Sequence, residues 1–346
     1  MAAEGNEGKL KGMEAMKANR IMRKFLAIGL LLGACGCGLA QEASKPAGKT
    51  VAEKLGYPKD ARLLIIHAQD MGLAHSVDKA TFEALEKGWV TSGSILVPCP
   101  WFPEVAAWAR NHPNADLGIR IEMNSVGPAY RWGPISAQKP GSGLVDADGY
   151  LPTTQRYVAQ HAKMEDVQAE ARAQIERARR DGVPITHLDN AMKTMIWTPE
   201  LFRVYWQLGQ EYKVPIVFPS RQVVQKGTLS ADGKNYMYGG IQVDIENVPM
   251  DGVLEMFAGY TQKDWLSVYE KTLEALPPGV YQLCVHLGYN NEELQAITGK
   301  EPNWGAQWRQ NDLDVVSSPE FQKFLKDKGF ILIGWKDLQK AMPLHP

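Results

Sequence analysis

Polar side chains suited to acid–base or metal chemistry recur where the apolar runs of this sequence end. His67, Gln69 and Asp70 close one run, and His187 and Asp189 lie at the end of another. Carboxylates and imidazoles bind divalent metal ions and transfer protons in hydrolytic sites. Other runs end in, or are soon followed by, Arg120, Glu122, Asn124, Lys193 and His286. The sequence therefore predicts one polar site assembled from several segments.

These residues are placed by an alternation of short apolar runs with amphipathic segments. The apolar runs predict β-strands at 62–68, 92–97, 116–122, 185–189, 214–218, 281–287 and 329–335. Helices between them predict a parallel α/β architecture, and closure into a (β/α) barrel is the simplest arrangement. An open doubly wound sheet is the alternative. In a barrel, active-site residues gather at the carboxyl ends of the strands, so the polar residues should meet at one rim.

The composition of the 346 residues is that of a globular protein, with 45% hydrophobic residues and a net charge of -1. This balance excludes intrinsic disorder, and it excludes binding to nucleic acid through bulk basic charge. Two of the four cysteines, Cys99 and Cys284, fall in or beside predicted strands. We expect both to be free, buried thiols.

Residues 1–40 are predicted to be a signal peptide. Basic residues precede a charge-free run over 25–40, which is shorter than the roughly 20 apolar residues of a membrane span. The segment before Cys35 has the pattern of lipoprotein signals, with the lipid on that cysteine, whereas the segment before Gln41 suits an ordinary signal peptidase. The remainder, 41–346, is expected to be a single exported domain, periplasmic or anchored to the membrane by lipid.

Several short motifs of the mature chain resemble the YdjC-like carbohydrate deacetylases. They are LIIHAQDMG at 64–72, GWVTS at 88–92, PCPWF at 98–102, DLGI at 116–119, LVD at 144–146, PITHLD at 184–189, HLGY at 286–289 and SSPE at 317–320. The resemblance implies a distorted (β/α) barrel of the glycoside hydrolase/deacetylase type, and often a homodimer. It also implies hydrolysis of the acetamide group of an N-acetylated oligosaccharide, assisted by a divalent metal ion, Mg or Zn.

The resemblance assigns the catalytic positions, and this sequence departs from several of them. The family pattern has two adjacent aspartates, the first a base and the second a metal ligand, and two histidine ligands. Here Gln69 stands at the position of the base, and Asp70 retains the position of the carboxylate ligand. Arg120 and Ala191 occupy the positions of the histidine ligands, while His286 retains that of the acid that protonates the leaving amine.

The substitutions change what the site can do. Glutamine has no carboxylate to act as a base, and arginine repels a divalent ion. A single carboxylate binds Mg or Zn weakly, so we expect metal binding to be weak or absent. We expect Arg120 to pair with Asp70 in the space of the ion, with Lys193 adding a second positive charge. The alternative is a relocated metal site built from His67, His187, Asp189 and Glu122.

Three functions remain open on the sequence. The first is an exported carbohydrate deacetylase that works with unusual ligands. The second is a non-catalytic glycan-binding protein that retains the sugar cleft. The third, a glycosidase, requires a pair of carboxylates that does not stand out from the spacing.

A sugar ligand would be held by polar and aromatic side chains near the strand ends. The expected polar contacts are Arg120, His187, Asp189 and Lys193. Tyr130 and Trp132 lie in a Gly- and Pro-rich insertion over 126–150, and are predicted to stack on sugar rings. Other aromatic residues in predicted loops or just after strands are Trp101, Trp197, Trp304 and Trp308. Arg309 is expected to form a structural salt bridge with Asp312.

Overall fold

The structure is a computed structural model that describes residues 49–127, 129–226, 228–229, 235–244, 248–256, 264–299 and 301–341. Residues 48–346 form one compact unit. The predicted signal peptide, with Cys35, lies outside the described residues and stays a prediction. No described helix is long and apolar enough to span a membrane.

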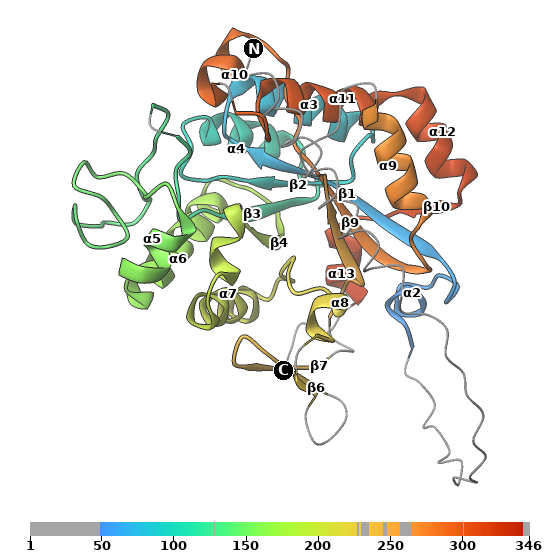
Figure 1. Cartoon of the computed structure of the whole chain (residues 1–346), viewed down its shortest axis with the longest axis horizontal. Coiled ribbons are helices and arrows are strands. Elements are labelled where there is room, and N and C mark those ends of the chain that lie inside the picture. Colours follow the sequence, from blue (N-terminus) through green and yellow to red (C-terminus); the bar gives the residue numbers. More distant parts are fainter. Residues whose placement is uncertain are drawn as a thin grey trace, which may run out of the picture. The chain divides into compact units, whose positions relative to one another are not determined.

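A parallel sheet forms the centre of this unit, with strand β1 (Arg62–Met71) in its middle (Figure 1). The order is β4-β3-β2-β1-β9-β8, and β10 pairs with the first residues of β1. The other strands are β2 (Ser92–Ile95), β3 (Leu117–Ile121), β4 (Ile185–Asn190), β8 (Gly252–Glu255), β9 (Gly279–Val285) and β10 (Phe330–Leu332). The predicted parallel α/β architecture is therefore confirmed.

The sheet is curled as in a barrel rather than flat. Strands β1 and β4 are three positions apart, which would separate them by about 14 Å in a flat sheet. Yet the rings of His67 on β1 and His187 on β4 meet edge to face, with centroids 5.0 Å apart. Curling brings the inner faces of these strands together, in agreement with the expected distorted (β/α) barrel and not with an open doubly wound sheet.

Side chains of β1 are buried on both faces, as parallel strands require. Leu63 and Ile65 point to the inside of the curled sheet, where they pack with Trp335 of helix α13 (Trp335–Ala341). Leu64 and Ile66 pack against the outer helices. His67 follows the first set, so the alternation of the strand places it inside the barrel.

Helices surround the sheet (Figure 1). They are α2 (Val51–Lys54), α3 (His75–Glu86), α4 (Phe102–Asn111), α5 (Gln155–His161), α6 (Met164–Arg180), the 3-10 helix η1 (Ala191–Ile196), α7 (Pro199–Tyr212), α8 (Arg221–Val224), α9 (Trp265–Glu274), α10 (Glu292–Thr298), α11 (Ala306–Ser317) and α12 (Pro319–Asp327). Helices α7 and α12 begin at Thr198-Pro199 and Ser318-Pro319, where each hydroxyl accepts a backbone N–H and proline takes the first helical position.

Over its described residues, the structure lacks one of the predicted strands and contains four strands that the sequence did not predict. The predicted strand at 214–218 is wrong, because only a single bridge joins Ile216 to Leu188. Strand β8 and a small antiparallel sheet of β5 (Thr228–Leu229), β6 (Asn235–Tyr238) and β7 (Ile241–Asp244) were not expected. Cys99 and Cys284 are free and buried, as predicted.

Candidate ligand-binding site at the strand ends

A distortion near the end of β1 brings two consecutive side chains to one site. Neighbouring residues of a regular strand point to opposite faces, but Asp70 has a φ of 70° and the register with β2 shifts between Ala68 and Met71. Gln69 and Asp70 consequently both reach the inner end of the barrel, where each binds residues of other strands or helices. The left-handed conformation costs about 1 kcal/mol or more in a residue other than glycine, so the surrounding contacts must hold it.

Two arginines hold the Asp70 carboxylate from both sides. Arg120 Nε lies 3.0 Å from Asp70 Oδ1, and Arg309 Nη2 donates to Asp70 Oδ2 at 2.7 Å. Arg120 also donates through Nη1 to Asp189 Oδ2 at 2.5 Å. We call Asp70, Arg120, Asp189 and Arg309 the arginine cluster. Because its two guanidinium groups face two carboxylates, the cluster is balanced in charge.

The contacts of the cluster stabilise the charged forms of its members. Burial alone would raise the pKa of Asp70, but the charges of Arg120 and Arg309 hold it far below its ordinary value. Burial opposes ionisation of Asp189 in the same way, and Arg120 again reverses the effect and lowers its pKa. The pKa of Arg120 is raised by both carboxylates, despite its burial. The cluster therefore stays fully ionised at neutral pH.

The expected pairing of Arg120 with Asp70 is confirmed, but two related expectations are wrong. Lys193 does not supply the second positive charge, because its side chain is exposed and its Nζ pairs with Glu255 at 2.7 Å. The second cation is Arg309 of α11. Arg309 was expected to pair with Asp312, but that carboxylate instead accepts hydrogen bonds from neutral donors.

Neutral polar groups also donate hydrogen bonds to Asp189, the deepest member of the cluster. Gln69 Nε2 and Ser94 Oγ donate to Asp189 Oδ2 at 3.1 and 3.0 Å. His67 Nε2 is 3.0 Å from the Ser94 hydroxyl, and His67 Nδ1 is 3.1 Å from that of Ser92. Gln69, at the position that the resemblance assigns to the base, thus carries an amide that orients a buried carboxylate.

His187 lies deeper in the barrel and cannot contact a ligand at the rim. Its ring is fully buried, stacks on Trp335 with centroids 5.0 Å apart, and has Nδ1 2.9 Å from Thr186 Oγ1. A Cβ at Gly118 would lie 2.3 Å from His187 Nε2, so glycine is required there. The expected substrate contact by His187 is therefore wrong. Asp189, 2% exposed, lies beneath Arg120, so its expected substrate contact is also wrong.

Glu122 is a buried carboxyl group that forms no ion pair within the described part of the chain. Its Oε1 accepts a hydrogen bond from the Asn124 N–H at 2.7 Å. The side-chain amide of Gln174 accepts from the backbone N–H of Glu122 and donates to its backbone carbonyl. The pKa of Glu122 is raised to about 8. Burial is the main cause and the charge of Asp70 acts in the same direction, and together they outweigh the Asn124 N–H and Arg120, which lower the pKa. Glu122 is therefore largely protonated at pH 7.

His286 lies between the cluster and a second buried aspartate. Its Nε2 is 3.9 Å from Asp70 Oδ2, and its backbone N–H donates to Asp312 Oδ2 at 2.9 Å. The pKa of His286 is lowered to about 3. Burial is the main cause, and the charges of Arg309 and Arg120 also lower the pKa, whereas the charge of Asp70 raises it. Since the ring is neutral at physiological pH, it can donate or accept a hydrogen bond but carries no excess proton.

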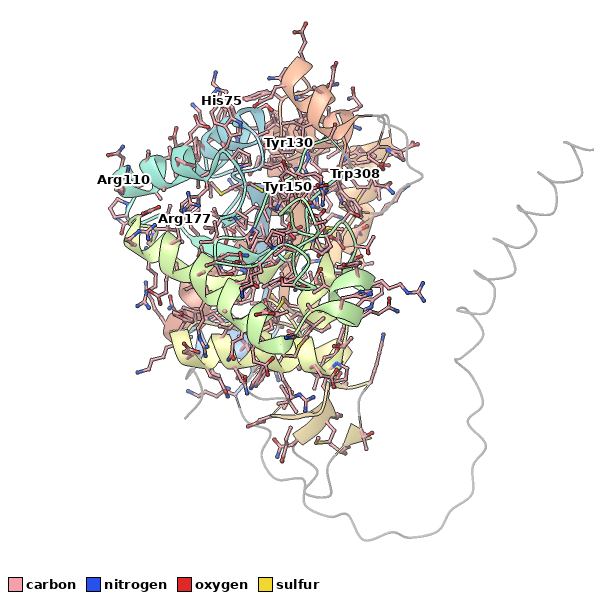
Figure 2. The ribbon with its side chains drawn as sticks, turned by 90° about the vertical axis from the view of Figure 1, so that its left-hand side faces the viewer. His75, Arg110, Tyr130, Tyr150, Arg177 and Trp308 are labelled. Atoms are coloured by element: carbon pink, nitrogen blue, oxygen red, sulfur yellow. The ribbon has the colours of Figure 1, made fainter. Side chains whose placement is uncertain are left out.

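The aromatic residues of the 126–150 insertion differ in accessibility. Trp132 is only 4% exposed, so its ring faces are covered by the core and the expected stacking on sugar is wrong. Tyr130 is partly buried, contacts Trp132 edge to face, and donates its hydroxyl to the Leu73 carbonyl at 2.6 Å. Tyr130 and His75 lie at the same end of the molecule (Figure 2). Tyr130 keeps its expected role as a prediction.

Arg309 is a site residue to which sequence reasoning gave the wrong partner. It stands 239 residues after Asp70, on a helix without a predicted link to β1. A weak signal was present, because Arg309 is the only basic residue of α11, and a helix that buries a lone arginine must supply it with acidic or carbonyl partners. Its partners are Asp70 and the backbone carbonyl of Trp304, which accepts from Arg309 Nε at 2.8 Å.

The described side chains do not fit a divalent metal ion. Both Asp70 oxygens are bound by guanidinium groups, and Arg120 and Ala191 stand where further ligands would be needed. Across the described residues, no group of three or more His, Cys, Asp or Glu side chains could hold a metal. The alternative, a relocated site from His67, His187, Asp189 and Glu122, is therefore not found among the described residues.

Comparisons with known proteins bear on this geometry. The sequence pattern of YdjC-like proteins matches residues 63–327. A carbohydrate deacetylase of Thermus thermophilus is 30% identical over 84% of this chain and 98% of its own length. One of Brevibacillus brevis is 23% identical over 80% and 99%.

A solved structure has the same fold. It is that of an Enterococcus faecalis protein named for the cleavage of cellobiose phosphate, with a TM-score of 0.64, 23% identity, and coverage of 80% of this chain and 99% of that one. The likeness extends over the curled sheet and its helices. Together with the match over 63–327, it leads to one conclusion: the chain belongs to the YdjC-like protein family.

Proposed function

We propose that this protein is an exported member of the carbohydrate deacetylases that binds N-acetylated glycans without metal-assisted hydrolysis. Its relatives are named carbohydrate deacetylases, which supports an acetylated sugar as the ligand. The single observation that carries the proposal is the arginine cluster, in which guanidinium groups take both oxygens of the one retained ligand, Asp70.

The chemistry of the cluster argues against the hydrolytic step. Gln69 cannot accept the proton of a water molecule, and its amide is already bound to Asp189. Asp70 is a weak base, because two arginines hold its pKa far below the ordinary value. His286, neutral with a pKa of about 3, lacks the second ring proton that a general acid would give to a leaving amine. Gln69 and Asp70 are therefore unable to accept the proton of a water molecule, and His286 is unable to act as a general acid.

Two polar atoms of the site have their hydrogen-bonding capacity unused. Within the part of the chain that the structure describes, Gln69 Oε1 and Arg309 Nη1 are buried without a hydrogen-bond partner. Buried polar atoms without partners are rare and costly in folded proteins. An acetamido group offers one N–H donor and one carbonyl acceptor, which complement an acceptor and a donor of this kind.

The proposal is tested by binding and turnover measured on the same preparation of the full chain. We expect calorimetry to detect N,N′,N″-triacetylchitotriose, acetate release to stay at the level of buffer, and elemental analysis with thermal shift to find no bound Zn, Mg, Mn or Ni. A stoichiometric metal together with acetate release would show an active deacetylase instead. The absence of binding to any acetylated oligosaccharide would contradict the proposed ligand.

A restoration variant sharpens the assignment of the substituted positions. Gln69→Asp, Arg120→His and Ala191→His together rebuild the family pattern around Asp70. We expect this variant, and not the wild type, to gain a thermal shift with a divalent metal. The matched control is Arg172→His on the outer face, where Arg172 pairs only with the exposed Glu211. Metal binding by the control would show that the gained histidines act nonspecifically.

Export and assembly form a separate part of the proposal. The basic segment and charge-free run of residues 1–40 support a signal peptide, and Cys35 is the proposed lipid site. Mass spectrometry of the mature chain distinguishes an acylated Cys35 from an amino terminus at Gln41, with Cys35→Ala as the control. A homodimer remains a prediction, which light scattering of the mature chain would test.

A further inference from the structure

We propose that the exposed indole of Trp304, held in place by Arg309, is the stacking platform for one ring of a neutral N-acetylated sugar. This inference rests on the proposed glycan-binding function and assigns the aromatic residue that carries it. It replaces the expectation placed on Trp132, whose ring is buried.

Trp304 is exposed in a way that packing alone does not explain. The side chain is 43% accessible, although tryptophan is among the costliest residues to leave in water. Its backbone has a φ of 57°, a left-handed conformation that is unfavourable for a bulky residue. A strained backbone that presents a large apolar ring to solvent is a feature of ligand-binding sites.

Hydrogen bonds of Arg309 stabilise this conformation of Trp304. Its Nε donates to the Trp304 carbonyl at 2.8 Å, while its Nη2 donates to Asp70 at 2.7 Å. The guanidinium thus couples the loop of Trp304 directly to the end of β1. The next residue, Gly305, approaches the Glu301 carbonyl so closely that a Cβ would lie 2.2 Å from its oxygen. The loop is therefore fixed at both the carbonyl of Trp304 and the residue that follows it.

The indole lies beside the polar site rather than apart from it. Its ring centroid is 5.9 Å from that of His286, whose Nε2 is 3.9 Å from Asp70. The Trp304 ring also approaches the buried ring of Trp308, with centroids 6.1 Å apart. A ligand ring against Trp304 would therefore have its polar substituents near His286 and the arginine cluster.

The surroundings select for an uncharged ligand with an amide or hydroxyl group. The two arginines and two aspartates of the cluster neutralise one another, so no net charge is left to attract an ionic ligand. Arg309 Nη1 is buried without a hydrogen-bond partner among the described residues, and it belongs to the guanidinium that holds the Trp304 carbonyl. A flat apolar face next to a free donor matches a sugar ring, which has an apolar C–H face and polar edges.

The test compares variants that remove or conserve the ring in the full-length protein. Trp304→Gly deletes the indole and fits the left-handed backbone without strain, so the fold should be retained. Trp304→Phe conserves an aromatic face. Tyr157→Ala is the control, because Tyr157 is an exposed aromatic residue stacked on a histidine, His161, but on the outer helix α5. Binding of N,N′,N″-triacetylchitotriose is measured by calorimetry, and melting temperature confirms folding.

We expect Trp304→Gly to weaken binding about tenfold or more, and Trp304→Phe and Tyr157→Ala to stay within about threefold of wild type. Wild-type binding that Trp304→Gly leaves unchanged, at an unchanged melting temperature, would overturn the platform while the proposed function survives. No binding by the wild type would overturn both. A further comparison uses fully deacetylated chitotriose, a cationic ligand, and equal binding of the two sugars would contradict the selection for a neutral one.

Discussion

Two aspartates lie near His286, Asp70 with its side chain 13% exposed and Asp312 fully buried, and they have similar numbers of partners but opposite pKa shifts. Asp70 is bound by two guanidinium groups, and its pKa lies far below the ordinary value. Asp312 accepts from the Trp265 indole, the Tyr269 hydroxyl and the His286 N–H at 2.7, 2.7 and 2.9 Å, but burial still raises its pKa to about 6. Neutral donors satisfy the oxygens of a carboxylate, but they do not replace the charge that stabilises its ionised form.

If metal-assisted hydrolysis is lost, as proposed above, the difference shows how the fold can persist without the metal. A carboxylate left at the barrel end without its metal would be a buried charge without compensation, which is strongly destabilising. Arg120 and Arg309 supply the missing positive charge to Asp70. The cost of that arrangement is functional, because the oxygens that a metal would need are occupied.

The largest expected effect comes from removing the central cation. Arg120→Leu leaves the buried Asp189 without its cation and Asp70 with Arg309 alone, and we expect the free energy of unfolding to fall by about 3–5 kcal/mol. Urea denaturation measures the change. A loss below about 1 kcal/mol would mean that the cluster is hydrated and that the comparison with Asp312 fails.

A pH series extends the comparison to Glu122, whose carboxyl group accepts from backbone N–H donors. Its folded pKa of about 8 exceeds the ordinary value of 4.5, so the folded state holds its proton more tightly than the unfolded state does. The resulting stability is present below pH 4.5 and is lost as pH rises toward 8, by up to about 1.4 kcal/mol per pH unit. Denaturation at pH 5 and pH 8 measures it.

Glu122→Gln is the control for that series, because glutamine conserves the shape but cannot titrate. We expect the variant to lose less stability than wild type between pH 5 and pH 8. Asp312, with a pKa raised from 3.8 to about 6, contributes in the same direction at lower pH in both proteins. Identical slopes for wild type and Glu122→Gln would show that Glu122 is ionised throughout.

A smaller effect is expected at the second aspartate. Asp312→Asn conserves the shape but turns one acceptor into a donor, which must face the Trp265 or Tyr269 donor or the His286 N–H. We expect a loss of about 1–3 kcal/mol, the usual cost of an unsatisfied buried polar group. The measurement is urea denaturation at pH 8, where Asp312 is ionised in wild type. A larger loss than that of Arg120→Leu would reverse the comparison.

The smallest effect is expected for an ion pair outside the barrel. Arg172 binds both oxygens of Glu211, in a geometry as good as that of the cluster, but both side chains are about two-fifths exposed. Arg172→Leu should cost about 0–1 kcal/mol, because water replaces the lost partner. A cost equal to that of Arg120→Leu would show that burial is not what makes the cluster important.

The chain by itself determined the alternation of strands and helices, the motifs of the family and the substitutions at the base and ligand positions. Strand periods and N-cap pairs such as Thr198-Pro199 are local signals, so they can be read without the fold. The pairing of Arg120 with Asp70 also followed, because a motif placed both residues at one rim and their charges are opposite.

Only the tertiary structure decided which side chains meet. Arg309 reaches Asp70 from 239 residues away, Lys193 turns outward to Glu255, and Trp132 is buried while Trp304 is exposed. None of these outcomes has a local cause, since each depends on how a helix or loop packs against the curled sheet. Residue type states what a side chain can bind, and packing determines the partner that it finds and the water that it loses.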